Sequence, residues 1–456
     1  MSRGRLIHPP RWRGEVVAVV NGGSAVTKTW ILVLLVVMVV FLYADNLVLS
    51  PNIDAIEKEF GATDSDIGNI SGLFVLVGAV VSLIWGYLGD RGSRKLLFVL
   101  SILIGEVPAL LTAFARTYPQ FFWLRVLTGI GIGASFPIAY SLVADLFNEK
   151  ERGTASAFVA GAIGFGSILG ALVGGYVGAT YGWRLPFILV AAPNFVLAVV
   201  FWLLVKEPRR GMSDEGLREL VEAGLVYPRT IKLSDYRRLV TIPTNLFLFI
   251  QGIAGSVPWG AIPLFLVTYL VRVRGLDQNA ATTVFLAFGI GNIVGIIFGG
   301  LIASNLYRKS PGLVPLFNGV TTAIGAGLAL LAFTAPWITG FGPIVLLGLV
   351  TSIFVSLTGP NVKMMLMNVN VPENRSTIFS IFNLTDSLGQ GIGRFVGGWL
   401  AQLFTVGPAL TISVLFWLPC ALFLIMLVRL FPRDVANLRE HMRGVARVMA
   451  GKAVSA

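Results

Sequence analysis

Twelve long apolar runs constrain the fold of this chain more than any other feature. A hydrocarbon core about 30 Å thick is crossed by roughly 20 apolar residues in a helix, and lipid solvates no backbone polar group. We therefore predict an all-α membrane protein with twelve transmembrane helices. The predicted spans are Trp30 to Leu49, Ile67 to Leu88, Leu96 to Ala115, Phe121 to Leu146, Thr154 to Val177, Leu185 to Val205, Ile242 to Leu270, Ala280 to Ile302, Leu313 to Thr334, Phe341 to Met367, Thr377 to Phe404 and Leu410 to Leu430.

The composition excludes several classes of protein. Charged residues make up 13% of the chain, which is about half of their share in a soluble globular protein. Cys420 is the single cysteine, and His8 and His441 lie in the polar tails. The membrane body therefore offers no disulfide, no Cys/His metal cluster and no Ser-His-Asp triad. We expect no enzyme, no metal and no cofactor, and the absence of a G-x-x-x-x-G-K-[ST] loop leaves a gradient as the energy source.

The basic residues predict the topology. If the amino terminus is inside, 27 Lys and Arg residues lie in the inner tails and loops and five in the outer loops. This bias predicts that both termini are cytoplasmic, and it explains the net charge of +12 without a nucleic-acid partner. The predicted parts are a cytoplasmic tail 1–29, a six-helix half 30–205, a cytoplasmic linker 206–241, a second six-helix half 242–430 and a basic cytoplasmic tail 431–456.

Two sequence repeats relate the predicted halves. GYLGDRGSRK at 86–95 resembles GLIASNLYRK at 300–309, with Gly, Arg and Lys at the same offsets. The stretch 152–176 also aligns without a gap on 375–399. Two halves of common origin are typical of secondary transporters whose substrate site lies between the halves near the midplane. Chance similarity between Gly-rich helices is the alternative.

The loop GYLGDRGSRK resembles the signature between helices two and three of the major facilitator superfamily, G-x-L-x-D-R-x-x-R-K. The resemblance implies alternating access with a charged gate at the inner membrane face. Gly86 would allow close helix approach, and Asp145 would end helix four beside the arginines. A solvated charge patch that only sets topology is the alternative. The residues of this predicted inner gate are Gly86, Asp90, Arg91, Arg94, Lys95 and Asp145.

Within that superfamily the chain resembles the spinster-like transporters, in the strings YADN (43–46), LRVLTGIGIGASFPIAYSLVADLF (124–147), VKEPRRG (205–211) and VPENRST (371–377). This implies a proton-coupled transporter of a lysophospholipid- or sphingolipid-like solute. Two positions depart from the group: Asn46 replaces an arginine, and Ile132 replaces an acidic residue.

A glycine pattern in helix five keeps a second function open. Gly166, Gly170, Gly174 and Gly175 have the spacing found in proton-coupled drug exporters, but Ala171 stands at the proline position. The alternative function is thus a proton-coupled exporter of drug-like cations or organic anions. Glycines four residues apart also suit plain helix packing.

Six ionisable residues inside the spans are functional hypotheses, because charges in lipid are costly. Asp45 and Arg125 lie at similar depth on helices one and four, so we predict that they form an ion pair. Separation of the pair would let Asp45 take a proton and couple proton binding to access. A fixed ion pair that orients two helices is the alternative. The six residues are Asp45, Glu106, Arg125, Lys363, Asp386 and Arg394.

The other charged residues have open alternatives. Glu106 either joins proton coupling from the cavity or accepts a hydrogen bond from the backbone freed by Pro108. Lys363 either binds an anionic group or reaches the inner interface with its stem. Arg394 is eight residues after Asp386 on the same helix and either clamps a phosphate or carboxylate or serves an outer gate.

The remaining predicted substrate contacts favour an amphiphile. Gln251, Trp259 and Asn46 join Asp386, Lys363 and Arg394 as candidate substrate-binding residues. A mainly apolar cavity with few polar groups fits an amphiphile better than a sugar. We expect a monomer in a cell membrane, with the bilayer, an amphipathic or lysolipid substrate and protons as its partners.

Overall fold

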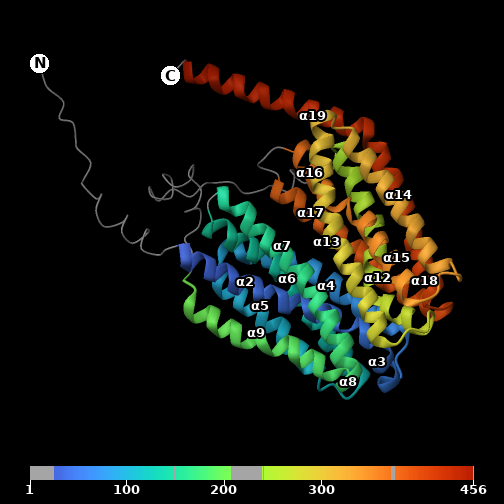
Figure 1. The fold of residues 1–456 in the computed structure, drawn as a ribbon. Helices are drawn as coiled ribbons and strands as arrows, with labels where there is room; N and C mark the ends of the chain where they lie inside the picture. The colour runs from blue at the N-terminus through green and yellow to red at the C-terminus, as the bar shows by residue number, and fades with distance from the viewer. Residues whose placement is uncertain (1–24, 148, 207–238, 240, 371–374, 455–456) are drawn as a thin grey trace, which may run out of the picture.

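The computed structural model describes residues 25–454 except 148, 207–238, 240 and 371–374. The described chain folds into two helical bundles (Figure 1). Most of the predicted tail 1–29 and linker 206–241 lies outside the described residues. We call the side of α3 and α8 outer and the side where α2 begins and α19 ends inner.

The N-terminal bundle is formed before the linker, and Thr63, Ser93 and Thr117 start three of its helices by accepting hydrogen bonds from backbone N–H groups. Its elements are α2 (Ala25–Val48), η1 (Ser50–Asn52), α3 (Ile53–Phe60), α4 (Asp64–Arg91), α5 (Arg94–Thr112), α6 (Tyr118–Leu146), α7 (Glu149–Leu172), the π-helical η2 (Val173–Val177), α8 (Gly178–Tyr181) and α9 (Arg184–Leu204).

The C-terminal bundle follows the linker, and Asp277 caps its second helix. The elements of this bundle are α12 (Pro243–Arg272), α13 (Gln278–Lys309), α14 (Leu313–Thr334), α15 (Phe341–Ser356), α16 (Gly359–Val369), α17 (Arg375–Leu403), α18 (Val406–Leu415) and α19 (Trp417–Val454).

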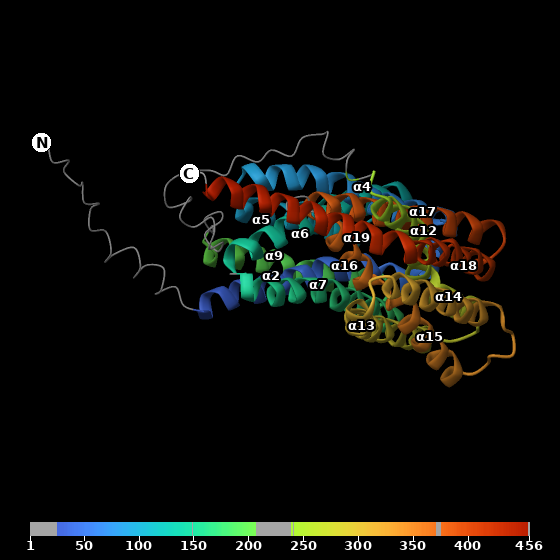
Figure 2. The same ribbon diagram turned by 90° about the horizontal axis from the view of Figure 1, so that it is seen from above.

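The structure confirms the predicted membrane-spanning helices, with one that is unusually polar. Among the described residues, eleven helical segments are long and apolar enough to cross a membrane. The twelfth predicted span is α17, which is 29 residues long and carries Asp386, Gln390 and Arg394. Helix α17 packs against both α12 and α4 (Figure 2). Because protein covers two of its faces, it needs less apolar surface than a helix that faces lipid.

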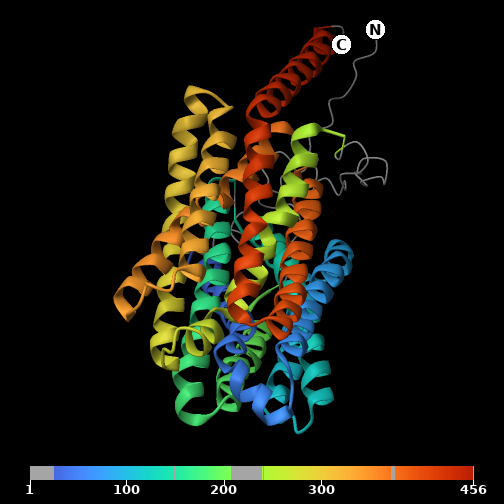
Figure 3. The same cartoon turned by 90° about the vertical axis from the view of Figure 1, so that its right-hand side faces the viewer.

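Two predicted spans are interrupted, and proline explains both breaks. The tenth span is divided after Ser356, four residues before Pro360, and the twelfth after Leu415, four residues before Pro419. Proline has no N–H for the carbonyl four residues earlier, and its ring crowds that carbonyl. Beyond the predicted end of the last span, α19 continues as a helix to Val454 and projects from the bundle (Figure 3).

Glycines set the closest helix contacts. In α7, Gly166 packs on the main chain of Val40 and Gly170 on that of Ala44, so α7 lies directly on α2. In the same way Gly78 of α4 meets Gly129 and Gly133 of α6. Small residues allow backbones to approach and gain packing where lipid supplies no hydrophobic driving force.

The two bundles meet at their outer ends. A Cβ atom built on Gly68 of α4 would lie 2.6 Å from the main-chain oxygen of Arg394, and one on Gly72 would lie 2.6 Å from the ring of Phe395. Further inward, Gly86 of α4 faces Pro137 of its own bundle. The bundles therefore diverge toward the inner side, as the ribbon shows (Figure 1).

Candidate functional site

A buried ion pair lies in the N-terminal bundle between α2 and α6. Arg125 Nη1 donates to both carboxylate oxygens of Asp45, at 2.9 and 2.7 Å, and Nη2 donates to the Asp45 main-chain oxygen at 3.2 Å. Both residues are buried, and the guanidinium lies over the rings of Phe74 and Phe187, 5.3 and 5.1 Å from their centroids. The predicted Asp45–Arg125 pair is confirmed, while its role in proton coupling stays a prediction.

Arg394 extends from α17 to the opposite bundle. Its Nη1 donates to Asn46 Oδ1 and to the main-chain oxygen of Ser71, both at 3.3 Å. Arg394 is buried, and its Nε has no hydrogen-bond partner. Among the described residues, no carboxylate lies within salt-bridge distance of this guanidinium. The second bundle therefore places an uncompensated positive charge beside α2 and α4.

Glu106 lies inside the N-terminal bundle, on α5. Asn194 of α9 donates through Nδ2 to Glu106 Oε1 at 2.5 Å and to the Met38 main-chain oxygen at 3.2 Å. Both residues are fully buried, and two acceptor atoms, Glu106 Oε2 and Asn194 Oδ1, have no hydrogen-bond partner. Of the two expectations for Glu106, the structure shows neither directly: its partner is an amide from α9, not the backbone near Pro108.

Asp386 links α17 to α12. It accepts hydrogen bonds from Ser256 Oγ and from Gln390 Nε2, the latter at 3.1 Å. Lys363 of α16 lies within electrostatic range of this carboxylate and has an exposed side chain. Asp386 and Arg394 form no ion pair, which agrees with their predicted separation along α17.

Gln251 and Trp259 hold α12 against its neighbours. Gln251 is buried, donates to the Leu248 main-chain oxygen at 3.0 Å and accepts from Cys420 Sγ at 3.3 Å. Trp259 stacks at an angle on Phe288 and Trp417, with ring centroids 5.8 and 6.1 Å apart. The amide of Gln251 is thus engaged within its own bundle, whereas half-buried Trp259 keeps part of its surface open.

The predicted inner gate is described only in part. The side chains of Asp90, Arg91 and Asp145 lie outside the described part of the structure. Arg94 donates to the Ser141 main-chain oxygen at 3.5 Å, and the Lys95 ammonium lies 4.5 Å from the ring centroid of Trp202. A Cβ atom on Gly86 would only touch Pro137, at 3.8 Å. The tightest glycine contacts between α4 and α6 lie further outward.

A cluster at the outer side, absent from the sequence predictions, joins the two bundles. Arg272, at the end of α12, contacts three carboxylates of the N-terminal bundle: Asp54 at 2.6 Å, Glu57 at 2.5 Å and Asp64 at 3.0 Å. We call Arg272 and these three residues the outer cluster. Three acids within eleven residues of an outer loop, against few outer basic residues, were the available signal. The cluster closes the outer side by charge pairing between the bundles.

The comparisons with known proteins agree with this geometry. The sequence model described as Major Facilitator Superfamily matches residues 35–343 and 319–442. The chain belongs to the major facilitator superfamily. It is therefore a multi-pass membrane transporter and not an enzyme, as the sequence predicted.

Among the relatives of this superfamily member are spinster proteins. It is 26% identical over 301 residues to the sphingosine-1-phosphate transporter SPNS2 of Danio rerio and 27% identical over 377 residues to protein spinster of Drosophila melanogaster. These matches cover 61% and 79% of this chain but 57% and 60% of the relatives. The chain thus spans less than two thirds of the length of these relatives.

The fold also matches a solved spinster homologue. A bacterial homologue of the human lysosomal transporter spinster, described as inward-facing and unoccupied, superposes with a TM-score of 0.80 at 20% identity. The match covers 90% of this chain and 99% of that one. The similarity to the spinster-like group predicted from the sequence is confirmed, and the fold is that of a major facilitator transporter.

Proposed function

We propose that this transporter moves an amphipathic anion resembling a lysophospholipid or sphingolipid, by alternating access coupled to protons. The observation that carries the proposal is Arg394, a buried arginine between the two bundles without a carboxylate partner among the described residues. A buried charge is tolerated when it is paired, so this site favours an anionic ligand.

The geometry around Arg394 suits a phosphate or carboxylate. Its described partners are two neutral oxygen atoms at 3.3 Å, and the N–H of Nε is unused. Guanidinium groups bind phosphate and carboxylate through two parallel hydrogen bonds, which are stronger than bonds to neutral acceptors. Asp45 does not meet this need because Arg125 already occupies both of its carboxylate oxygens.

The surroundings favour an apolar tail on that anion. Phe395 and Leu76 pack across the interface at glycines of the opposite helices, and Trp259 offers an aromatic face from α12. Among the relatives, SPNS2 of Danio rerio is named a sphingosine-1-phosphate transporter, whose substrate has an anionic head and one apolar chain. We extend that class of substrate to this chain, with Asn46, Asp386, Lys363 and Gln251 as further candidate contacts.

Proton coupling rests on two carboxyl groups in the N-terminal bundle. When Arg125 leaves Asp45, the carboxylate loses its counter-charge in a buried place and gains a proton more readily. Glu106 lies within electrostatic range of this pair. A proton on Glu106 Oε2 would turn one of two unpartnered acceptors into a donor, which satisfies its surroundings better. Proton transfer between the two carboxyls would then accompany the change of access.

Alternating access requires one gate on each side. The outer cluster holds the bundles together at the outer side in this conformation. In the opposite conformation, we propose that the motif from Gly86 to Lys95, with Asp145, closes the inner side. One arginine with three carboxylates is a reversible contact, because exposed ion pairs contribute little net energy individually.

An exporter of organic anions or drug-like cations is the second candidate. Arg394 would bind a small organic anion by the same hydrogen bonds, and Asp386, which accepts from Ser256 and Gln390, would attract a cation. The two candidates differ in whether an apolar chain is required for transport.

Flux in liposomes tests the proposal. The purified transporter is reconstituted, and uptake of a labelled lysophospholipid is measured with and without an imposed pH gradient. Gradient-driven flux that falls in Arg394→Gln supports the proposal. Flux indifferent to the gradient would retain the lipid and refute proton coupling. Flux of short-chain anions, with none of lysolipid, would favour the second candidate.

A further inference from the structure

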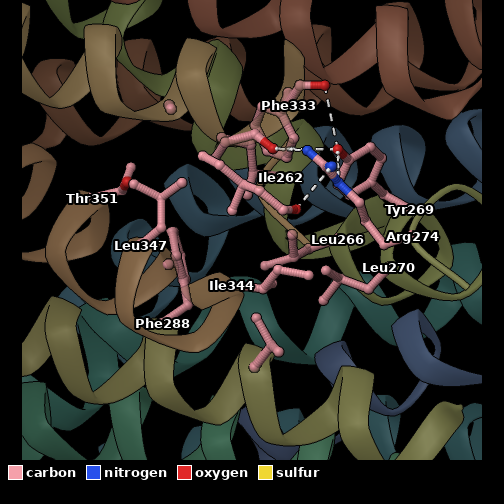
Figure 4. A pocket seen from close by; sticks show the side chains of 15 residues that line it. Ile262, Leu266, Tyr269, Leu270, Arg274, Phe288, Phe333, Ile344, Leu347 and Thr351 are labelled. Carbon is pink, nitrogen blue, oxygen red and sulfur yellow. Dashed lines mark hydrogen bonds between the residues drawn. The ribbon is translucent and has the colours of Figure 1, made fainter. Parts of the chain in front are cut away.

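A cavity lies within the C-terminal bundle, between the outer halves of α12 and α15 (Figure 4). Apolar side chains from α12, α13 and α15 form most of its wall, among them Ile262, Leu266, Phe288, Ile344 and Leu347. Its volume is about 50 Å³, whereas a single water molecule needs roughly 10 to 15 Å³ by this measure. The cavity therefore has room for a short alkyl chain and is too small for a full lipid chain.

Arg274 lies at one end of this cavity. Its Nε donates to Tyr269 Oη at 2.7 Å, and the two Nη atoms donate to the main-chain oxygens of Ala332, Ala335 and Ile338 at 2.5, 3.0 and 3.4 Å. These bonds use four of the five N–H groups of a guanidinium. All four acceptors are neutral.

The contrast with Arg272 shows what Arg274 lacks. Two residues earlier in the chain, Arg272 contacts three carboxylates. In the described part of the chain, no carboxylate oxygen comes within salt-bridge distance of Arg274. Its positive charge thus faces an apolar cavity with one N–H to spare, which favours an anionic group at this end.

Thr351 lies at the opposite end of the cavity, across Leu347 and Ile344 from Arg274 (Figure 4). It is 4% exposed, and its Oγ1 has no hydrogen-bond partner. Other helical threonines of this bundle, such as Thr321 and Thr334, donate to the carbonyl four residues earlier. A buried hydroxyl without a partner is rare, because losing its bonds to water costs free energy.

We propose that this cavity is a binding site for a short amphipathic anion, separate from the transport site at Arg394. The anionic group pairs with Arg274, an apolar body of a few carbons fills the space beside Leu266 and Leu347, and a hydroxyl or carbonyl at the far end bonds Thr351. An ω-hydroxy carboxylate has this chemistry. The proposal does not depend on the proposed function, because the site lies within one bundle.

Equilibrium dialysis of radiolabelled hexanoate and 6-hydroxyhexanoate against the purified full chain in phosphatidylcholine nanodiscs tests the site. We expect saturable binding of both acids and at least tenfold weaker binding of hexanol. The hydroxy acid should bind several-fold more tightly than hexanoate, and Thr351→Val should abolish that difference. Arg274→Gln should weaken both acids at least tenfold, and Arg116→Gln, at an exposed outer arginine, should not.

A second variant guards against misfolding, since Arg274 also holds the end of α14. Gly348 lines the cavity, and a Cβ atom there would meet Val284 at an ordinary 3.6 Å. Gly348→Leu should therefore fold, fill the cavity and abolish binding. Binding that survives both Arg274→Gln and Gly348→Leu would overturn the proposal, as would the absence of saturable binding in the native chain. Loss of binding in Arg394→Gln would assign the acids to the transport site and refute a separate one.

Discussion

Arg125 holds Asp45 through a single nitrogen placed 2.9 and 2.7 Å from its two carboxylate oxygens, and neither side chain reaches solvent. The pair joins α2 to α6 inside one bundle. A proton on Asp45 would remove the charge that holds the guanidinium, so protonation and the packing of these two helices are linked.

Asp45→Asn should abolish proton-driven uptake and destabilise the fold. The variant leaves Arg125 buried and unpaired, and breaking a buried pair in this way costs about 3 to 5 kcal/mol. The double variant Asp45→Asn with Arg125→Gln should regain part of the thermal stability but none of the coupling. Thermal unfolding and flux with a pH gradient measure the two effects. Normal gradient-driven uptake by Asp45→Asn would refute the coupling role.

Glu106→Gln should fold normally and change the pH dependence of transport. A glutamine keeps the oxygen that accepts from Asn194 and adds a donor for the unpartnered Asn194 Oδ1. Glu106→Ala should instead lose about 1 to 3 kcal/mol, because Asn194 loses a partner. The pH profile of exchange in liposomes is the measurement. An unchanged profile in Glu106→Gln would mean that Glu106 is only structural.

Arg394→Gln should raise the KM for an anionic amphiphile at least tenfold. Hydrogen bonds between charged groups contribute about 1.5 to 3 kcal/mol, which corresponds to roughly 10- to 150-fold in affinity. Arg394→Lys should recover only part of this, because an ammonium lacks the two-pronged geometry. Arg116→Gln is the matched control. An equal effect on a neutral monoacylglycerol would argue against recognition of the anionic head.

Arg272→Gln should open the outer side more often. The variant removes the charge that joins the outer cluster across the two bundles. Cysteine placed at buried Ser71, in a Cys420→Ser background, should then react several-fold faster with an impermeant maleimide from outside. Arg184→Gln breaks the Arg184–Glu59 pair within one bundle and serves as control. Equal labelling rates in both variants would exclude a gating role for the cluster.

Gly170→Leu should destabilise the protein by about 1 to 3 kcal/mol or prevent folding, because overpacking displaces a well-packed neighbour. A Cβ atom at Gly170 would overlap the main chain of Ala44, whereas one at Gly164 would meet nothing within 4 Å. Gly164→Leu is therefore the control. Thermal unfolding of the two variants compares them. Equal stability would contradict helix packing as the purpose of the glycine pattern in α7.

Several features were predictable because they are local to one helix. Each apolar run carries its own requirement for lipid, so twelve spans follow from length and hydropathy. Depth along a helix increases by about 1.5 Å per residue. The positions of Asp45 and Arg125 within their apolar runs therefore place both residues at the same depth, and they do form a pair. The family signature at 86–95 likewise depends on adjacent residues alone.

What the sequence could not determine depends on the direction in which side chains point around each helix and on how the bundles pack. The contact of Arg394 with Asn46 joins residues 348 positions apart, and the outer cluster forms only because the end of α12 lies against α3 and α4. Glu106 faces α9 because the rotation of α5 is set by packing. The sequence thus determined which segments cross the membrane and how deep each charge lies, whereas the tertiary structure decided which charges are paired and which remain for a ligand.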